Sequence, residues 1–227
     1  MLYKSRGIAL SYIKYRESSI IARIFTEAFG MQSYIVNSVR TKAAKTKIAL
    51  FQPLTLLDMV VYHNKKKEIN RISEIKCSYT LQTIPYDIRK TSIALFITEL
   101  LNQTLREEGE NEQLFNFIQE SIISFDMMKE GLENFHLQFL MQFSRYQGIK
   151  PESAMSLLKE IGHAKAYDKL FCEQVDFFLH SNFDQYMKIS KSARGEILMA
   201  MINYYRYHYD VVKEFKSIQV LKEVLGG

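Results

Sequence analysis

Along the first 80 residues, apolar and polar residues alternate in short runs with the period of β-strands. Five runs are rich in β-branched or aromatic residues, and short polar breaks separate them. Two of the runs do not alternate cleanly, which is typical of strands that bend or bulge to close a barrel. The pattern predicts a small five-stranded barrel, an OB-fold in the first place and an SH3-like barrel as the competitor. The five runs are residues 7–15, 18–27, 31–39, 52–63 and 68–77.

After residue 80 the apolar residues recur at intervals of three and four, which predicts helices. The chain is therefore predicted to be an α+β protein. An OB-fold barrel is expected in residues 1–80 and an all-helical domain in residues 81–227. Polar residues just before the apolar stretches are the expected N-caps. These caps are Asp87, Asn111, Ser192 and Ser217.

The middle of the helical half contains an unusually apolar segment, LENFHLQFLMQFSRYQG. Its phenylalanines recur at i+4, and apolar residues cover most of its circumference, so we expect this helix in the middle of a bundle. Gly148 is the expected C′ residue, and Pro151 is expected at the first position of a short helix that runs to Leu158. Residues 162–191 are the least regular part and predict loop with short helical pieces.

Charge divides the two halves further. Residues 1–80 contain 14 Lys and Arg against 5 Asp and Glu, whereas residues 81–227 contain 16 against 20. A basic half joined to a mildly acidic half points to a polyanionic partner for the barrel. The alternative is a basic surface that serves only solubility, although solubility does not require the two signs to be segregated.

The densest group of cations lies in the segment VRTKAAKTKIALFQP, residues 39–53, between the third and fourth predicted strands. No Asp or Glu occurs between Glu27 and Asp58. Cations without acids can neutralise phosphates and release counterions, which drives sequence-independent binding of nucleic acid. The cations of this basic loop are Arg40, Lys42, Lys45 and Lys47.

A second basic patch is expected at the hairpin between the last two predicted strands, although an ordinary charged hairpin tip explains it equally well. It consists of Lys65, Lys66, Lys67 and Arg71. Aromatic residues near both basic segments could stack on bases, but at the period of a strand most of them belong to the core, and one or two should be accessible. These aromatic residues are Tyr12, Tyr15, Phe25, Tyr34, Phe51 and Tyr62.

Catalytic signatures are absent. The chain has no P-loop, dinucleotide glycine fingerprint, G-x-S-x-G or H-E-x-x-H pattern, so an enzyme is not expected. His163, Cys172 and His180 could be imagined around a metal, but no C-x-x-C pair anchors them, and we expect neither metal nor cofactor. Two distant cysteines suit a reducing cytoplasm, and no apolar run approaches the ~18 residues of a membrane span.

Three long segments resemble, in order, the RecO family of recombination mediators. They are GIALSYIKYRESSIIARIFTEAFG, VRTKAAKTKIALFQPLTLLDMVVYH and the closing RGEILMAMINYYRYHYDVVKEFKSIQVLKEVL. The junction segments RISEIKCSY and IPYDIRKTSIALFITELL are also similar to that family. The resemblance covers nearly the whole chain, and its strength lies in the succession of matches, because none of the motifs is highly specific alone.

The resemblance implies an N-terminal OB-fold and a helical C-terminal domain. It implies binding of single- and double-stranded DNA, annealing of complementary strands, and work beside RecR in the cytoplasm near the nucleoid. It also implies binding to the acidic C-terminal tail of single-stranded DNA-binding protein, so that the recombinase can be loaded. The basic loop matches the family's, so DNA binding is carried onto its four cations. Many relatives have a cysteine-rich zinc module, which FCEQVDFFLHSNF, with one cysteine, cannot form.

Partner binding is expected in the helical half. A tail peptide that is acidic and ends in apolar residues needs an apolar pocket with a cation at its rim. Arg145, Arg194 and Arg206 lie on apolar predicted helices and are the candidates, with internal ion pairing or plain solvation as the alternative for each. Two other functions stay open: an RNA-binding OB-fold protein, and a protein-interaction scaffold whose basic face is incidental.

Overall fold

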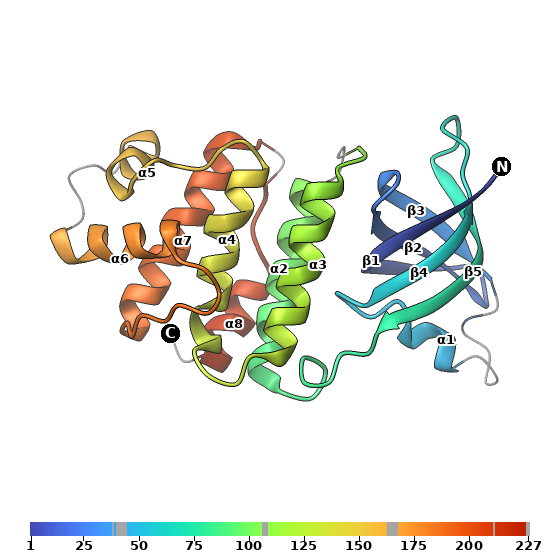
Figure 1. Cartoon of the computed structure of the whole chain (residues 1–227), viewed down its shortest axis with the longest axis horizontal. Coiled ribbons are helices and arrows are strands. Elements are labelled where there is room, and N and C mark those ends of the chain that lie inside the picture. Colours follow the sequence, from blue (N-terminus) through green and yellow to red (C-terminus); the bar gives the residue numbers. More distant parts are fainter. Residues whose placement is uncertain (38, 40–44, 106–108, 163–167, 211, 226–227) are drawn as a thin grey trace. The chain divides into compact units, whose positions relative to one another are not determined.

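The contacts of the chain group it into two compact units, which are described one at a time. The first unit holds Met1–Gln82 and Leu101–Ile123, and the second holds Thr83–Leu100 and Ser124–Gly227. The first unit thus takes in residues that the sequence assigned to the helical domain, and the boundary after residue 80 stays a prediction. The structure is a computed structural model, which describes residues 1–37, 39, 45–105, 109–162, 168–210 and 212–225 (Figure 1).

The first unit is built on a closed five-stranded barrel with the strand order β1-β2-β3-β5-β4. All pairs of neighbouring strands are antiparallel except β3 and β5, which are parallel. Together with the helix between β3 and β4, this is the expected OB-fold, and it lies at the N-terminus as predicted. The strands are β1 (Leu2–Tyr15), β2 (Ser19–Thr26), β3 (Gly30–Val36), β4 (Leu56–Tyr62) and β5 (Ile69–Tyr79).

Strand β1 closes the barrel because it bends. Its first half pairs with β4, from Leu2 opposite Tyr62, and its second half pairs with β2. The register with β2 shifts between Ala9 and Ser11, which is the bulge expected where a strand turns from one neighbour to the next. The strand also begins five residues earlier than the sequence pattern indicated.

The barrel interior is filled mainly by aliphatic side chains, with Tyr34 and Phe51 as large fillers. Helix α1 (Lys45–Ala49) lies in the connection between β3 and β4, where the sequence pattern indicated only a loop. Phe51 lies two residues after the end of α1 and is buried in the barrel core, so an apolar side chain fixes the described end of the basic loop to the barrel.

Within the first unit, Arg6 of β1 joins the barrel to α3 (Glu112–Met127). Its guanidinium pairs with Glu27 at 2.6 Å and donates to Asn116 Oδ1 at 2.7 Å and to Gln119 Oε1 at 3.2 Å. The same group lies 5.0 Å from the ring centroid of Phe115. Glu27 gains a charged hydrogen bond from Arg6, which lowers the pKa of its carboxyl. One arginine therefore fixes the described start of α3 against the barrel.

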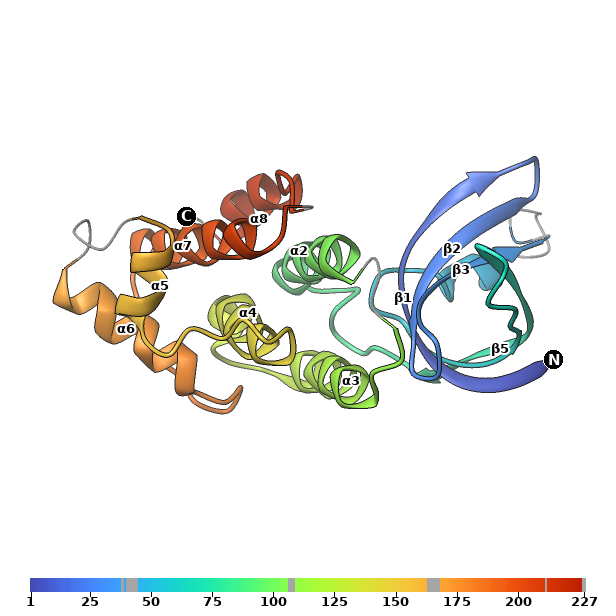
Figure 2. The same ribbon diagram turned by 90° about the horizontal axis from the view of Figure 1, so that it is seen from above.

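The second unit consists of helices (Figure 2). Helix α4 packs against α6 and α7, and α5 packs against the same two helices. No helix among the described residues is long and apolar enough to cross a membrane. The helices not yet bounded are α2 (Ile88–Thr104), α4 (Phe135–Tyr146), α5 (Ala154–Glu160), α6 (Lys169–His180), α7 (Lys191–His208) and α8 (Ser217–Leu225).

Helix α4 lies in the interior of this unit, as its apolar circumference predicted. Its phenylalanines belong to a chain of ring contacts that runs from Phe125 through Tyr205 to Tyr209. Ring centroids are 4.2 Å apart for Phe125 and Phe135, and 5.6 Å apart for Phe139 and Phe143. The unit is therefore stabilised by a continuous aromatic core.

The hydrogen bonds at the starts of the helices show which of the predicted N-caps are correct. Asp87 Oδ1 accepts from the backbone N–H of Arg89, and Asn111 Oδ1 accepts from that of Leu114, so both predicted caps are confirmed. Ser192 is not a cap, because α7 begins at Lys191, two residues earlier than predicted, and the hydroxyl of Ser190 accepts from the N–H of Ala193 instead.

Of the other predicted helix boundaries, Gly148 is confirmed, whereas the starts expected at Ser217 and Pro151 are not. Ser217 is the first residue of α8, and its hydroxyl donates to Glu99 Oε2 at 2.6 Å. Gly148 has the positive φ of 70° expected of a C′ glycine. The helix expected from Pro151 begins later, at Ala154, because Ser153 forms a capping box with Ser156.

The segment 162–191 is more regular than the sequence pattern indicated. Helix α6 occupies twelve of its residues, and Asp168 caps that helix by accepting from the N–H of Phe171. The helix buries an apolar face, which includes Phe171, Val175 and Phe178. The prediction of loop with short helical pieces was therefore wrong for residues 169–180.

Candidate nucleic-acid interface

Half of the basic loop can be placed. Arg40 and Lys42 lie outside the described residues. Lys45 is the first residue of α1, and Lys47 lies in its last turn with an exposed side chain. The described part of the loop therefore presents at least one solvent-exposed cation from a short helix.

Lys47 lines a groove of about 220 Å³ on the barrel together with Arg71. Arg71 lies on β5, where it is opposite Ile35 of β3 in the parallel register. Most of the remaining lining is apolar, with residues from β3, β5 and the segment after α1, and we call this apolar part the floor. Asn37 and Ser73 are the polar residues of the lining. A guanidinium and an ammonium above an apolar floor suit a chain of phosphates and bases. The floor residues are Ile35, Val36, Leu50, Phe51, Ile72 and Ile75.

The second basic patch is divided by the fold. Arg71 lines the groove of Lys47, whereas Lys65 and Lys67 line a different and larger cavity. Lys66 is exposed but lines neither of them. The turn that carries these lysines is held by Asn64, whose side chain accepts from the N–H of Lys66 at 2.9 Å and whose carbonyl accepts from that of Lys67 at 3.0 Å.

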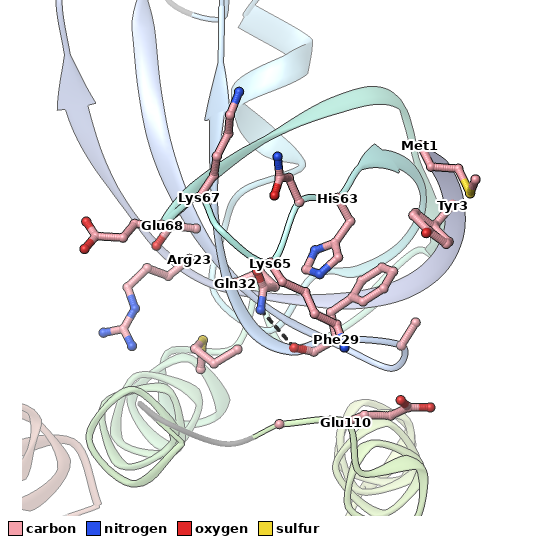
Figure 3. Close-up of a pocket in the computed structure, with 15 residues that line it drawn as sticks. Met1, Tyr3, Arg23, Phe29, Gln32, His63, Lys65, Lys67, Glu68 and Glu110 are labelled. Atoms are coloured by element: carbon pink, nitrogen blue, oxygen red, sulfur yellow. Dashed lines mark hydrogen bonds between the residues drawn. The ribbon is translucent and has the colours of Figure 1, made fainter.

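The larger cavity has a volume of about 1070 Å³ and an aromatic wall (Figure 3). The rings of Phe29 and His63 are stacked with centroids 3.9 Å apart. Tyr3 packs edge-on against Phe29 at 5.4 Å and against His63 at 6.3 Å. We call the space bounded by these three rings, Lys65 and Lys67 the aromatic cavity.

His63 is an uncharged part of this wall at neutral pH. Burial lowers the pKa of its imidazole, and the nearby charge of Lys65 acts in the same direction. Its Nδ1 atom is buried without a hydrogen-bond partner, which further disfavours the protonated ring because that form has two donors. The side chain therefore behaves as a flat aromatic group.

Half of the six aromatic residues that the sequence pointed to are core residues. Phe25, Tyr34 and Phe51 are buried, and Tyr62 is 50% exposed. Tyr12 and Tyr15 are half-buried. Sequence reasoning missed Tyr3 and Phe29, because β1 was expected to begin at residue 7 and Phe29 was assigned to a turn. The only sequence signal for them was their place beside predicted strand ends.

The three candidate partner-binding arginines lie in different settings. Arg145 is exposed in the last turn of α4. Arg206 is half-buried in the last turn of α7 and donates weakly, at 3.4 Å, to the carbonyl of Lys213. Arg194 donates from Nε to Asn134 Oδ1 at 3.0 Å, and burial lowers the pKa of its guanidinium. The structure does not bring the three together in one described cavity.

Arg194 lies beside an apolar depression between α7 and α8. Lys191 and Lys222 also line it, so three cations surround its leucines. The free space is only about 10 Å³, which is about one water-sized probe, so a peptide side chain could enter only if α8 moved outward. The lining leucines are Leu198, Leu221 and Leu225.

Metal-ligating residues do not cluster within the described ranges: no three His, Cys, Asp or Glu side chains lie close enough to hold an ion. His163 lies outside those ranges, so the set imagined from the sequence cannot be assessed as a whole. Cys77 and Cys172 are free thiols, the first exposed and the second half-buried.

Comparison with known proteins gives matches along almost the whole chain. The family model described as Recombination protein O N terminal matches residues 1–81, and the one described as Recombination protein O C terminal matches residues 85–155. Proteins named DNA repair protein RecO are similar over the full length. Those of Flavobacterium psychrophilum and Phocaeicola vulgatus are 34% and 32% identical, with all of both chains covered. That of Bacteroides fragilis is 34% identical, with 99% of each chain covered.

Proposed function

The chain belongs to the RecO family of DNA repair proteins, and from this membership we propose that it acts as a recombination mediator. The proposed activity has three parts. The barrel binds single- and double-stranded DNA, bound complementary strands anneal, and the recombinase is helped onto DNA that is covered by single-stranded DNA-binding protein. Such a protein would be associated with the nucleoid.

The observation that supports DNA binding most directly is the groove shared by Lys47 and Arg71. Two cations from separate elements face the same apolar floor, and Arg40 and Lys42 precede α1 in the chain. Phosphate contacts of this kind give affinity without reading sequence, because the charge of the backbone is the same at every step. The groove therefore suits a protein that must act on any sequence.

Annealing needs no catalytic step in this proposal. Cations lower the repulsion between two phosphate backbones, and the free energy of base pairing then drives the reaction. The barrel has only to bind strands loosely enough that pairing can displace it. No nucleotide hydrolysis and no cofactor take part.

The helical domain, residues 81–227, is proposed to bind the protein partners, RecR and the acidic tail of single-stranded DNA-binding protein. Among the candidate arginines, Arg194 has the setting that best supports tail binding, because Lys191 and Lys222 lie beside it around apolar side chains. An acidic peptide with an apolar end matches that combination. Arg145 and Arg206 remain candidates for the same partner or for RecR.

A binding experiment at matched salt tests the DNA assignment. Fluorescence anisotropy with single-stranded DNA, duplex DNA and RNA of the same sequence should show tight binding of DNA. Arg71→Gln should weaken it, while Lys76→Gln should not, although both remove one charge from β5. Lys76 pairs with Asp58 at 3.4 Å and lines no part of the groove. Tighter binding of RNA than of DNA would contradict the proposal in favour of an RNA-binding protein.

A further inference from the structure

The aromatic cavity is separate from the groove of Lys47 and Arg71, and neither of these two cations lines it. Its lining residues come from β1, from β2, β3 and the turn between them, from the connection between β4 and β5, and from the segment before α3. Residues distant in sequence thus form one concave surface on the first unit. With a volume of about 1070 Å³, it is large enough for a nucleotide-sized ligand.

The aromatic wall is accessible to solvent. Tyr3 is 39% exposed, and Phe29 and His63 are half-buried. Figure 3 shows the three rings together on one side of the cavity, with Arg23 and Glu68 on the other side. An aromatic wall open to water offers a surface on which a planar base can stack, whatever its sequence identity.

The charges around the cavity favour an anion next to this wall. Lys65 and Lys67 line it, together with Arg23, whereas Glu68 and Glu110 are the acids of the lining. In Figure 3, Lys65 lies beside the stacked rings of Phe29 and His63, on their side of the cavity rather than on that of Glu68. A phosphate attached to a stacked base would therefore have Lys65 on its side of the cavity, where Glu110 is the nearby acid.

We propose that the aromatic cavity binds one unpaired nucleotide of a nucleic-acid strand. The base stacks on the wall of Tyr3, Phe29 and His63, and its phosphate lies beside Lys65. Lys67, whose side chain points away from the rings in Figure 3, meets a neighbouring phosphate of the strand. The inference rests on the proposed DNA binding and deepens it, because it gives the barrel a means of preferring single strands. A base inside a duplex is covered on both faces by its neighbours, so it can enter the cavity only after it has been unpaired and flipped out of the stack, which costs free energy.

The aromatic part is tested with the full chain and a single-stranded oligonucleotide that carries a fluorescent adenine analogue, whose emission falls when it stacks. Tyr3→Ala should weaken binding by about fivefold to a hundredfold, the range for removal of one stacking aromatic group. It should also remove the quenching, while Tyr3→Phe should retain both. Tyr62→Ala is the matched control, because Tyr62 is 50% exposed, precedes His63 directly and does not line the cavity.

The charged part has an internal control in the same turn. Lys65→Gln and Lys67→Gln should each reduce the slope of log K against log salt by about 0.7 in magnitude, which is the share of one phosphate of a single strand. Lys66→Gln, at the same charge cost, should leave the quenching and nearly all of the slope unchanged. All three lysines are exposed, so these changes test binding even if Tyr3→Ala disturbs folding.

The outcomes separate the two proposals. If the wild-type chain binds single strands but Tyr3→Ala equals Tyr62→Ala and Lys65→Gln equals Lys66→Gln, the aromatic cavity is not a nucleotide site and the proposed function stands. If Tyr3→Ala lost the same affinity for duplex DNA as for single-stranded DNA, the nucleotide site would also be refuted, because a paired base cannot reach the cavity. If the wild-type chain binds no DNA at all, the proposed function itself is wrong.

Discussion

The barrel and the helices of the second unit differ in what stabilises them and in where their charges lie. The barrel core is mainly aliphatic, and its cations lie in connections such as α1 and the turn after β4 or at outward-facing strand positions such as Arg71 of β5. The second unit has a continuous aromatic core that runs through α4 to Tyr205. Binding chemistry can therefore be changed on the barrel without touching its core, whereas the helical unit depends first on packing.

The largest effect should come from opening the aromatic core. Phe139→Ala removes a buried ring between Phe135 and Phe143 and should lower the free energy of unfolding by about 3–5 kcal/mol. Urea unfolding measures this loss. The folded variant should keep its affinity for single-stranded DNA, and a parallel loss of affinity in the folded protein would break the separation between the two regions.

The next effect concerns the basic loop. Replacing its four cations, Arg40, Lys42, Lys45 and Lys47, by Glu should weaken DNA binding by about two orders of magnitude at physiological salt and slow annealing. Anisotropy measures the affinity, and circular dichroism checks the fold.

A matched control carries the same charge change on the helical unit, at the exposed residues Lys129, Lys150, Lys159 and Lys169. If both quadruple variants lose the same affinity, net charge rather than the basic loop drives binding. In the wild-type chain, contact with roughly three to five phosphates should give a salt slope of about −2 to −4, and a flat response would refute the electrostatic account.

A pH effect should distinguish the helical unit. Burial lowers the pKa of His136 to about 3, and its Nδ1 atom has no hydrogen-bond partner. The unfolded chain therefore binds a proton below about pH 6.5 that the folded chain does not, so stability falls as pH falls from 6.5 towards 3. Between pH 6.5 and pH 5 the loss should be about 2 kcal/mol.

Urea unfolding at several pH values measures this dependence. His136→Gln should be less stable at pH 7 but should show a flatter response to acid. The lowered pKa of His63 acts in the same direction in both proteins, so only the difference between them reports on His136. An unchanged slope in the variant would show that His136 is not the responsible group.

A smaller effect is expected on the binding of the tail peptide at the apolar depression between α7 and α8. Arg194→Ala should weaken binding of the acidic tail peptide by about tenfold, or about 1.4 kcal/mol. Arg145→Ala should do less, since Arg145 is exposed and does not line the leucine-lined depression. Calorimetry with the full chain decides between them, and equal affinities for wild type and all three arginine variants, including Arg206→Ala, would place the peptide elsewhere.

The smallest expected effect concerns metal content. Elemental analysis of the purified protein should find no stoichiometric zinc, because two separate cysteines give too few soft ligands. About one zinc per chain would show that His163, Cys172 and His180 had been undervalued.

Local patterns determined much of this protein. The alternation of apolar and polar residues predicted five strands near their observed places. The phenylalanines at i+4 predicted the buried position of α4. Asp87 and Asn111 were correct caps because each is a good N-cap residue that stands directly before its helix. Ser190 and Ser192 were harder to separate, because both can cap and only the packing of α7 selects one. Helix α6 was missed although the sequence carried a signal for it, because Phe171, Val175 and Leu179 recur at i+4 and Asp168 is a good N-cap residue.

The aromatic cavity was decided by tertiary structure alone. Tyr3, Phe29 and His63 are far apart in the chain, and each by itself looks like an ordinary residue at a strand end. They meet because β1 pairs with β4, which sets Tyr3 opposite Val61, and because the turn after β2 lies at the same end of the barrel. Periodicity states which face of a strand is buried, whereas barrel closure determines which strand ends become neighbours, and that depends on pairing between distant segments.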